Sequence, residues 1–426
     1  MNWAKLFDGR KDNPLFNTSY PLSPGDWAQY RANAPLPFCR EQEMSFYIHI
    51  PFCRQLCSFC EYTRMNCPDT DSQLQYVNTI GRDISRFIAH HHNVRLAGFD
   101  IGGGTPTALY DDIFARLMDI FKAATDSLTQ EKDFEPSIEA TFNTLTPLKA
   151  RLIAKAGIRR VSLGVQSASE DILHGNHRQD TSVEMMRDSL AMLHGEGIEK
   201  VNIDMMYGLK GQTLKSLDTD LLTISRLHPE QVTLYELRTN MIKEACHMTK
   251  EELFRAYSIL FNGLTAMGYH ADWGGNTFSI SSKDKGVSSY LRNRMLHGGS
   301  YKGFGISAQS MSREGVAYNV GKSSRNIKNL IGLNSYGEEF TYLLPPAELA
   351  AKYIAIGAYN GSFSLSQLSE ILGCNAEDYY SEQLSMCHDN GLLAAAKDDP
   401  DRIVITRKGF KYYGAVFSLF YSPHRD

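Results

Sequence analysis

The sequence predicts an α/β protein whose core is a partial barrel of about six βα units, followed by a helical C-terminal domain. Short apolar segments of strand length alternate with longer segments of helical period from residue 44 to about residue 280. This alternation is typical of right-handed βαβ units and a parallel sheet. Several polar motifs come directly after the predicted strands, where a barrel of this type carries its active groups.

The predicted strands and helices follow one another in regular order. The strands are expected at 45–50, 98–101, 137–141, 160–165, 200–205, 231–237 and 270–273, and the helices between them at 72–91, 110–126, 146–156, 181–196, 212–227 and 249–267. About six units are visible, which is too few for a closed barrel of eight. We therefore expect a six-unit partial barrel with a parallel sheet.

Composition divides the chain into three predicted parts. Residues 1–43 are rich in Pro and Asn and predict an irregular N-terminal arm, residues 44–340 form the core with a Gly- and Ser-rich extension, and residues 341–426 form a helical domain. This last domain is expected to contain helices 346–359, 364–372 and 377–391 and a hairpin of 392–396 and 402–407. Three helices and a hairpin are typical of a winged-helix-like unit. Its acidic residues favour a packing or lid role over DNA binding.

Composition also excludes several classes of protein. The chain has 426 residues, of which 42% are hydrophobic and 22% charged, with a formal net charge of -4. This apolar content is ample for a packed core. The longest apolar runs are short and interrupted, and residues 1–10 carry charge throughout, so neither a membrane span nor a secretory signal is expected. We expect a cytoplasmic protein with no nucleic-acid partner and no integral membrane segment.

Three of the eight cysteines form a C-x3-C-x2-C array, Cys53, Cys57 and Cys60. In a reducing compartment, clustered cysteines are read as metal ligands or reactive thiols. A zinc site needs four ligands, and Cys67, seven residues further on, is an awkward fourth. A [4Fe–4S] cluster normally takes four cysteines, so three would leave one iron open to a substrate or cofactor.

Polar and glycine-rich positions mark the ends of the predicted strands. The motif 102–106, Gly-Gly-Gly-Thr-Pro, directly follows one strand and lets the backbone approach a ligand closely. Glu139, Gln166 and Asp204 interrupt or close apolar segments. A buried polar group is costly unless it is paired or bound to a ligand. Three such groups on successive strands favour a polar ligand site.

Taken together, these motifs resemble radical SAM enzymes of the oxygen-independent coproporphyrinogen III oxidase-like (HemN-like) group. The resemblance covers about residues 12–425 and is carried by 47–60, 102–106, 160–166 and 202–213, with Thr18-Ser19-Tyr20-Pro21 in the arm and 303–311 near the end of the core. It implies an oxygen-sensitive, anaerobic enzyme with a radical SAM barrel. Its cluster is expected to receive an electron from a donor such as flavodoxin or ferredoxin.

The resemblance also implies roles for individual residues. The metal ligands would be Cys53, Cys57 and Cys60, which would hold a [4Fe–4S] cluster whose open iron chelates S-adenosylmethionine (SAM). Matching cofactor positions are Tyr47, Gly103 and Glu139 for this SAM, Phe59 nearby, and Gly104, Thr105, Gln166, Arg178 and Asp204 for a second SAM. Arg238 and Gln309 align with two further contact positions, although their residue types differ from the family pattern. No catalytic residue is assigned.

Two departures from the pattern direct the functional prediction. Tyr62 stands where the coproporphyrinogen oxidases carry a further cysteine, and residues 13–17 lack the basic residue of those enzymes. A substrate with four propionates would need fixed cations there. The leading prediction is therefore a methyltransferase that methylates an sp2 carbon of a small-molecule ring substrate, such as a quinone, a porphyrin or a fused heteroaromatic. The alternatives are an oxygen-independent coproporphyrinogen III oxidase (dehydrogenase) of heme biosynthesis and a heme-binding or heme-delivery protein.

Overall fold

Six parallel strands stand at the centre of a twelve-stranded sheet in the part of the chain that the computed structural model describes, residues 1–13, 16, 20–237, 248–324 and 326–421. In spatial order they are β2 (Glu43–Ile50), β5 (Arg95–Gly103), β6 (Ser137–Ala140), β7 (Arg160–Gln166), β8 (Lys200–Tyr207) and β9 (Gln231–Glu236). Each neighbouring pair is parallel. The first six predicted strands and the α/β fold class are thus confirmed.

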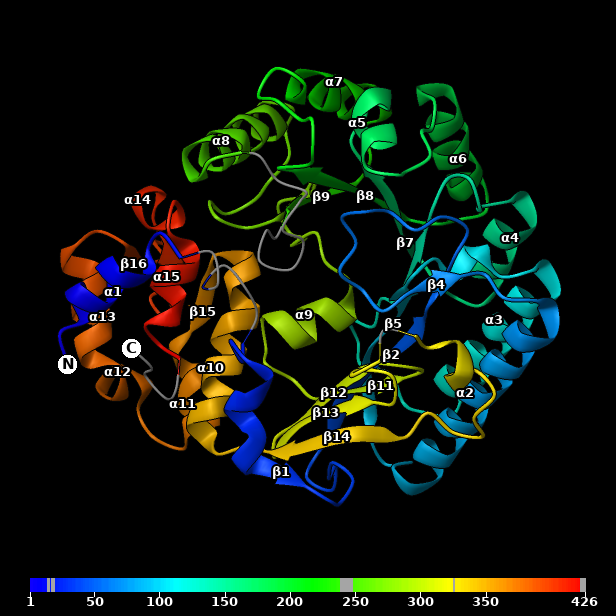
Figure 1. Cartoon of the computed structure of the whole chain (residues 1–426), viewed down its shortest axis with the longest axis horizontal. Coiled ribbons are helices and arrows are strands. Elements are labelled where there is room, and N and C mark those ends of the chain that lie inside the picture. The colour runs from blue at the N-terminus through cyan, green and yellow to red at the C-terminus, as the bar shows by residue number, and fades with distance from the viewer. Residues whose placement is uncertain (14–15, 17–19, 238–247, 325, 422–426) are drawn as a thin grey trace.

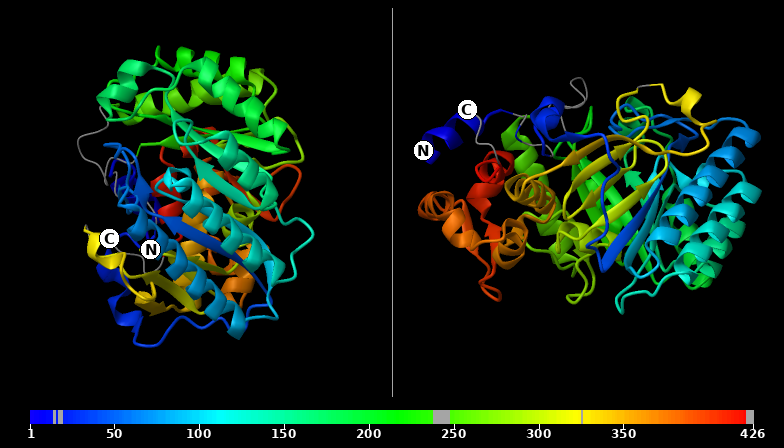
Figure 2. Two further views of the ribbon diagram at one scale, coloured as in Figure 1. Left: turned by 90° about the vertical axis from the view of Figure 1, so that its right-hand side faces the viewer. Right: turned by 90° about the horizontal axis from the view of Figure 1, so that it is seen from below.

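Helices that follow these strands in the chain lie along the outer face of the curved sheet (Figures 1 and 2). They are α2 (Thr70–His90), α3 (Asp111–Asp126), α4 (Pro147–Lys155), α5 (Glu170–Gly175), α6 (Val183–Gly195), α7 (Leu217–Leu227) and α8 (Lys250–Ala266). In α2, Tyr76, Ile80 and Ile84 recur every four residues and are buried against the sheet. The helix begins where the Asp69 carboxylate accepts a hydrogen bond from the Ser72 N–H at 2.9 Å.

The sheet extends on both sides of these six strands and does not close. Next to β2 lie β11 (Tyr301–Phe304), β12 (Gln309–Ser312), β13 (Gly315–Asn319), β14 (Glu338–Leu343) and β1 (Arg31–Ala32), and β10 (Thr277–Ser279) pairs antiparallel with β9. The strand predicted at 270–273 is wrong, because among these residues only His270 forms a bridge, with Ser279. The short helix α9 (Ser289–Met295) lies near the centre of the molecule (Figure 1).

The C-terminal region is helical, with one small sheet, as predicted. It contains α10 (Pro346–Gly357), α11 (Leu365–Leu372), α12 (Ala376–Tyr379), α13 (Ser381–Asp389), α14 (Arg407–Phe410) and α15 (Tyr413–Ser418). The predicted hairpin is β16 (Leu393–Ala395) with β17 (Arg402–Ile405), and β15 (Ser362–Ser364) pairs with β17 as a third strand. No helix within the described residues is long and apolar enough to cross a membrane.

The N-terminal arm is not wholly irregular, since it contains helix α1 (Trp3–Arg10) and the 3-10 helix η2 (Pro24–Tyr30). It packs on the C-terminal region. Arg10 Nη1 donates to the Ser418 carbonyl at 2.8 Å, and Trp27 Nε1 donates to Glu348 Oε2 at 2.8 Å. Strand β14 crosses the boundary predicted at residue 340. The predicted division of the chain into three domains therefore stays a prediction. In the structure, the N-terminal arm and the C-terminal region pack against each other.

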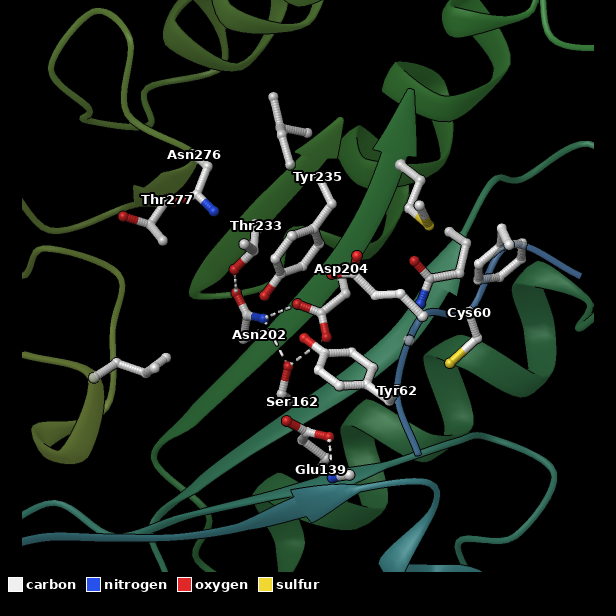
Figure 3. Close-up of a pocket in the computed structure, with 18 of the residues that line it drawn as sticks. Cys60, Tyr62, Glu139, Ser162, Asn202, Asp204, Thr233, Tyr235, Asn276 and Thr277 are labelled. Atoms are coloured by element: carbon white, nitrogen blue, oxygen red, sulfur yellow. Dashed lines mark hydrogen bonds between the residues drawn. The ribbon is translucent and has the colours of Figure 1, made fainter. Parts of the chain in front are cut away.

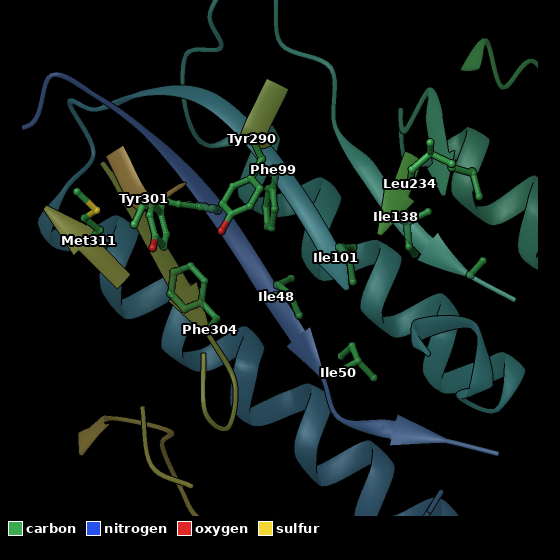
Figure 4. Close-up of a cluster of buried hydrophobic side chains, with 14 of the residues drawn as sticks. Ile48, Ile50, Phe99, Ile101, Ile138, Leu234, Tyr290, Tyr301, Phe304 and Met311 are labelled. Carbon is green, nitrogen blue, oxygen red and sulfur yellow. The ribbon is translucent and has the colours of Figure 1, made fainter. Parts of the chain in front are cut away.

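The hydrophobic core is densest around β2 and β5. Ile48, Ile101 and Ile138 on three neighbouring strands have no exposed surface (Figure 4). The rings of Phe46 and Phe99 meet edge to face with 5.5 Å between centroids. Burying one such side chain contributes roughly 1.5–3 kcal/mol. Along β7 and β8, apolar residues alternate with polar residues or glycine, so each strand buries one apolar face and turns its other face to a cavity.

Candidate active site

The cysteine array follows the carboxyl end of β2. Cys53 lies on the two-residue strand β3 (Phe52–Cys53), which pairs with β4 (Met65–Asn66), and its carbonyl accepts the Cys67 N–H at 3.0 Å. The loop turns where Cys60 N–H donates to the Cys57 carbonyl at 3.4 Å. All three cysteines of the array line one cavity of about 700 Å³. Burial raises the pKa of the Cys53 thiol to about 12 and also raises that of Cys60.

The chemistry and packing of these thiols fit an iron–sulfur cluster. A Cβ placed on Gly104 would lie 2.9 Å from Cys53 Sγ, so a larger residue would obstruct this thiol. Within the described ranges, no three His, Cys, Asp or Glu side chains converge on a single metal ion. Cys67, whose thiol donates to the Ala108 carbonyl at 3.9 Å, lies outside the cavity. Three cysteines that line one cavity supply the soft thiolate ligands that an iron–sulfur cluster takes.

The carboxylate of Glu139 lies against the glycine motif at the end of β5. Its Oε2 accepts the Gly103 N–H at 3.0 Å. A Cβ on Gly102 would lie 2.6 Å from this carboxyl group, and Gly103 has a φ of 113°, which favours glycine. Burial raises the pKa of Glu139 to about 7. The glycines thus let a carboxylate that faces the cavity approach the backbone beside the cysteine loop.

A second polar group spans β7, β8 and β9. Asp204 accepts hydrogen bonds from the Ser162 hydroxyl and from Asn202 Nδ2, both at 2.8 Å. Asn202 Oδ1 in turn accepts the Thr233 hydroxyl at 3.0 Å. Figure 3 shows Asp204, Ser162, Glu139 and Tyr62 pointing toward one another. Burial raises the pKa of Asp204, and these donors hold its carboxylate in one orientation.

Gln166 and Arg178 complete the cavity wall next to the cysteines. Gln166 ends β7 with a φ of 74°, a conformation that is uncommon for a non-glycine residue. Arg178 donates to the Gly164 carbonyl and, through Nη1, to Cys57 Sγ at 3.5 Å. A Cβ on Gly164 would lie 2.7 Å from Gln166 Nε2, so this glycine makes room for both side chains.

Comparison with known proteins assigns this arrangement to a family. The family model of the radical SAM superfamily matches residues 47–224, the segment from β2 into α7. The chain carries a radical SAM domain. The superfamily implies a [4Fe–4S] cluster and SAM as cofactors, whereas the number of SAM molecules stays a prediction. The predicted superfamily is confirmed.

Relatives of this radical SAM protein bear two kinds of name. The heme chaperone HemW of Bacillus subtilis is 26% identical over 88% of this chain and 98% of its own length, and that of Lactococcus lactis is 26% identical over 88% and 97%. The oxygen-independent coproporphyrinogen III oxidase of Cereibacter sphaeroides is 28% identical over 54% of this chain and 50% of its own. None of these relatives is named as a methyltransferase.

A solved structure shares the fold. The coproporphyrinogen III oxidase HemN from Escherichia coli superposes with a TM-score of 0.71 over 90% of this chain and 91% of that one, at 22% sequence identity. The match includes the central parallel sheet and most of the remaining chain. It confirms the HemN-like fold that the sequence motifs predicted.

The structure brings most predicted site residues together. The cavity of the radical SAM domain is lined by Cys53, Cys57, Phe59, Cys60, Gly103, Gly104, Thr105, Glu139, Gln166, Arg178 and Asp204. Tyr47 is not among the lining residues, because its ring stacks on Tyr290 at 5.6 Å between centroids. Gln309 is also outside the wall, and Arg238 lies outside the described residues. The ligand contacts of all these residues stay predictions.

Sequence reasoning missed several lining residues. Ser162 and Asn202 are polar positions inside apolar strands, so the argument that singled out Asp204 could have found them. Arg294 lies on α9, in a stretch without periodicity, and no sequence signal marked it. Tyr359 and Phe410 come from the C-terminal region, which only tertiary packing brings to the cavity.

Proposed function

We propose that this radical SAM protein acts on a cyclic tetrapyrrole. The observation that carries this proposal is the continuity of the cavity, which runs from the three thiols to an aromatic and apolar wall formed by Ile356, Tyr359, Phe410 and Tyr413. Flat unsaturated rings pack well on such walls. The names of the relatives support this substrate class, because both heme and coproporphyrinogen are tetrapyrroles.

Each part of the cavity has a separate task in the proposed reaction. Cys53, Cys57 and Cys60 would hold the cluster, which together with SAM supplies a carbon radical when both are bound. Glu139 and Asp204 offer fixed carboxylate oxygens to ribose hydroxyls or an ammonium group. The surrounding side chains exclude water from the reacting atoms.

For the reaction we propose methyl transfer to an sp2 carbon of the ring. This reaction needs two SAM molecules, one as the methyl donor and one as the source of the radical. The cavity offers two polar sites for them, one formed by Glu139 with Gly103 and one by Asp204 with Gln166 and Arg178. Tyr62, in place of a cysteine, lines the same space. Oxidative decarboxylation of coproporphyrinogen III is the second candidate, favoured by the relative of that name.

Product analysis separates these reactions. The reconstituted protein is incubated without oxygen with a reductant, methyl-labelled SAM and a tetrapyrrole or quinone pool, with Cys57→Ala as the inactive control. Methyl transfer yields labelled ring product, S-adenosylhomocysteine and 5′-deoxyadenosine together. Carbon dioxide from coproporphyrinogen III, without S-adenosylhomocysteine from any ring tested, would establish the second candidate and reject the first. Heme bound tightly without turnover would instead favour heme delivery.

A further inference from the structure

Arg294 is a cation that lines the cavity. It lies on α9, and its guanidinium carbon stands 5.1 Å from the centroid of the Tyr301 ring. Its Nη2 donates weakly to Gln309 Oε1 at 3.5 Å, and its Nε is buried with no acceptor among the residues that the structure describes. No carboxylate in the described ranges of the chain forms an ion pair with this side chain.

The groups that face Arg294 are uncharged. They are the phenols of Tyr62, Tyr290 and Tyr301 and the amide of Gln309. Burial raises the pKa of Tyr290 and of Tyr301, so both phenols keep their protons at neutral pH. A buried cation without compensating charge is costly to the folded state. The site therefore contains positive charge that the described chain does not neutralise.

Gln309 holds the guanidinium but does not neutralise it. Its Oε1 accepts the Tyr301 hydroxyl at 2.6 Å, and its Nε2 donates to the Tyr318 hydroxyl at 2.8 Å. The oxygen and the nitrogen of this amide are thus both hydrogen-bonded to tyrosine hydroxyls next to Arg294. The amide of Gln309 and the Tyr301 ring fix the direction of the guanidinium, whereas the SAM contact predicted for Gln309 stays a prediction.

We propose that Arg294 binds a carboxylate of the ring substrate. The inference rests on the proposed function and specifies it, since a tetrapyrrole with acidic side chains would place an anion beside its apolar ring. A planar guanidinium suits a carboxylate because two parallel N–H groups can donate to its two oxygens. Residues 13–17 contain no basic residue, whereas Arg294 supplies a cation from another part of the chain.

Binding of matched porphyrins tests the proposal. The probes are protoporphyrin IX and its dimethyl ester, titrated in one detergent into the full chain, Arg294→Gln and Arg292→Gln. The control Arg292 lies on the same helix but donates to the exposed Asp133 carbonyl at 2.7 Å and does not line the cavity. The wild-type protein and Arg292→Gln should prefer the acid by about tenfold to a hundredfold. Arg294→Gln should lose this preference and bind the ester unchanged.

The thermal midpoint without ligand provides a second readout. Arg294→Met should not lower the midpoint and is expected to raise it, because it removes an uncompensated buried cation. Protoporphyrin IX should then stabilise the wild-type protein more than the variant. Equal affinity of the wild-type protein for acid and ester overturns the role of Arg294 but leaves the tetrapyrrole proposal intact. Failure of the wild-type protein to bind either porphyrin overturns the tetrapyrrole proposal and, with it, the proposed binding of a tetrapyrrole carboxylate by Arg294.

Discussion

The guanidinium of Arg178 donates a hydrogen bond to the thiol of Cys57 at 3.5 Å, although 121 positions separate the two residues in the sequence. The same guanidinium donates to the Gly164 carbonyl at the end of β7. Arg178 therefore joins the cysteine loop to the strand edge that carries Gln166. A change at this arginine leaves the three cysteines intact and should affect the neighbouring cofactor edge.

Replacing Arg178 by Lys tests this connection. Lysine keeps the positive charge but lacks the planar fork that serves Cys57 and Gly164 together. We expect iron content close to that of the wild-type protein and an affinity for SAM reduced by about tenfold, since one charged hydrogen bond contributes roughly 1.5–3 kcal/mol. Iron analysis and equilibrium SAM binding measure these quantities. Exposed Arg187 on α6, changed to Lys, is the control, and equal SAM affinity in both variants would contradict the prediction.

The cysteines of the array should be individually essential for the cluster. Cys53→Ala, Cys57→Ala or Cys60→Ala removes one of only three thiols that line the cavity within the described ranges. Each variant should lose the iron–sulfur absorbance and all cleavage of SAM. Cys39→Ala and Cys374→Ala, at exposed free cysteines, should keep both. Full cluster content in Cys57→Ala would refute the ligand assignment.

Asp204→Ala should weaken cofactor binding while the fold persists. The carboxylate is held by Ser162 and Asn202 and lines the cavity, so its loss removes a fixed acceptor rather than part of the apolar core. Loss of one charge-assisted hydrogen bond corresponds to roughly a tenfold to hundredfold weaker affinity for SAM. Binding titrations measure the affinity, and circular dichroism checks the fold. Exposed Asp188, changed to Ala, should behave like the wild-type protein.

Glu139 should make the cofactor-free protein less stable as the pH rises. Burial raises its pKa from 4.5 to about 7. Between these values the unfolded chain releases a proton that the folded protein retains, so the free energy of unfolding falls as the pH rises through this range. Glu139→Gln removes this loss and can still accept the Gly103 N–H. Denaturant unfolding should show a larger stabilisation by this variant at pH 8 than at pH 5.

Asp100 is a second carboxyl group that titrates in this pH range, because burial raises its pKa to about 7. Its charge contributes to the raised pKa of Glu139, so the difference between the two proteins reports Glu139 together with its interaction with Asp100. A stability difference between the wild-type protein and Glu139→Gln that is the same at both pH values would show that the Glu139 carboxyl group is not desolvated in the free protein.

The local sequence determined the parallel core and the cofactor motifs. The strands are short segments with regularly placed apolar residues, and the cysteine array and the glycine motif are each contiguous, so all of them can be found from the order of neighbouring residues. Glu139, Gln166 and Asp204 were found because a polar group inside a buried strand is costly without a partner. All of these features lie within short segments of the chain, so they can be recognised directly from the amino-acid sequence.

Tertiary structure decided what depends on distant contacts. The strands β10 to β14 are short, and most pair antiparallel with one another, so the Gly- and Ser-rich segment showed no pattern that predicted them. The contact of Arg178 with Cys57 and the place of Arg294 among neutral tyrosines depend on which segments pack together. The sequence identified a radical SAM core, whereas tertiary packing decided which charged side chains face its cavity. The reason is that a cation is neutralised only by groups that lie next to it in space, and these come from distant parts of the sequence.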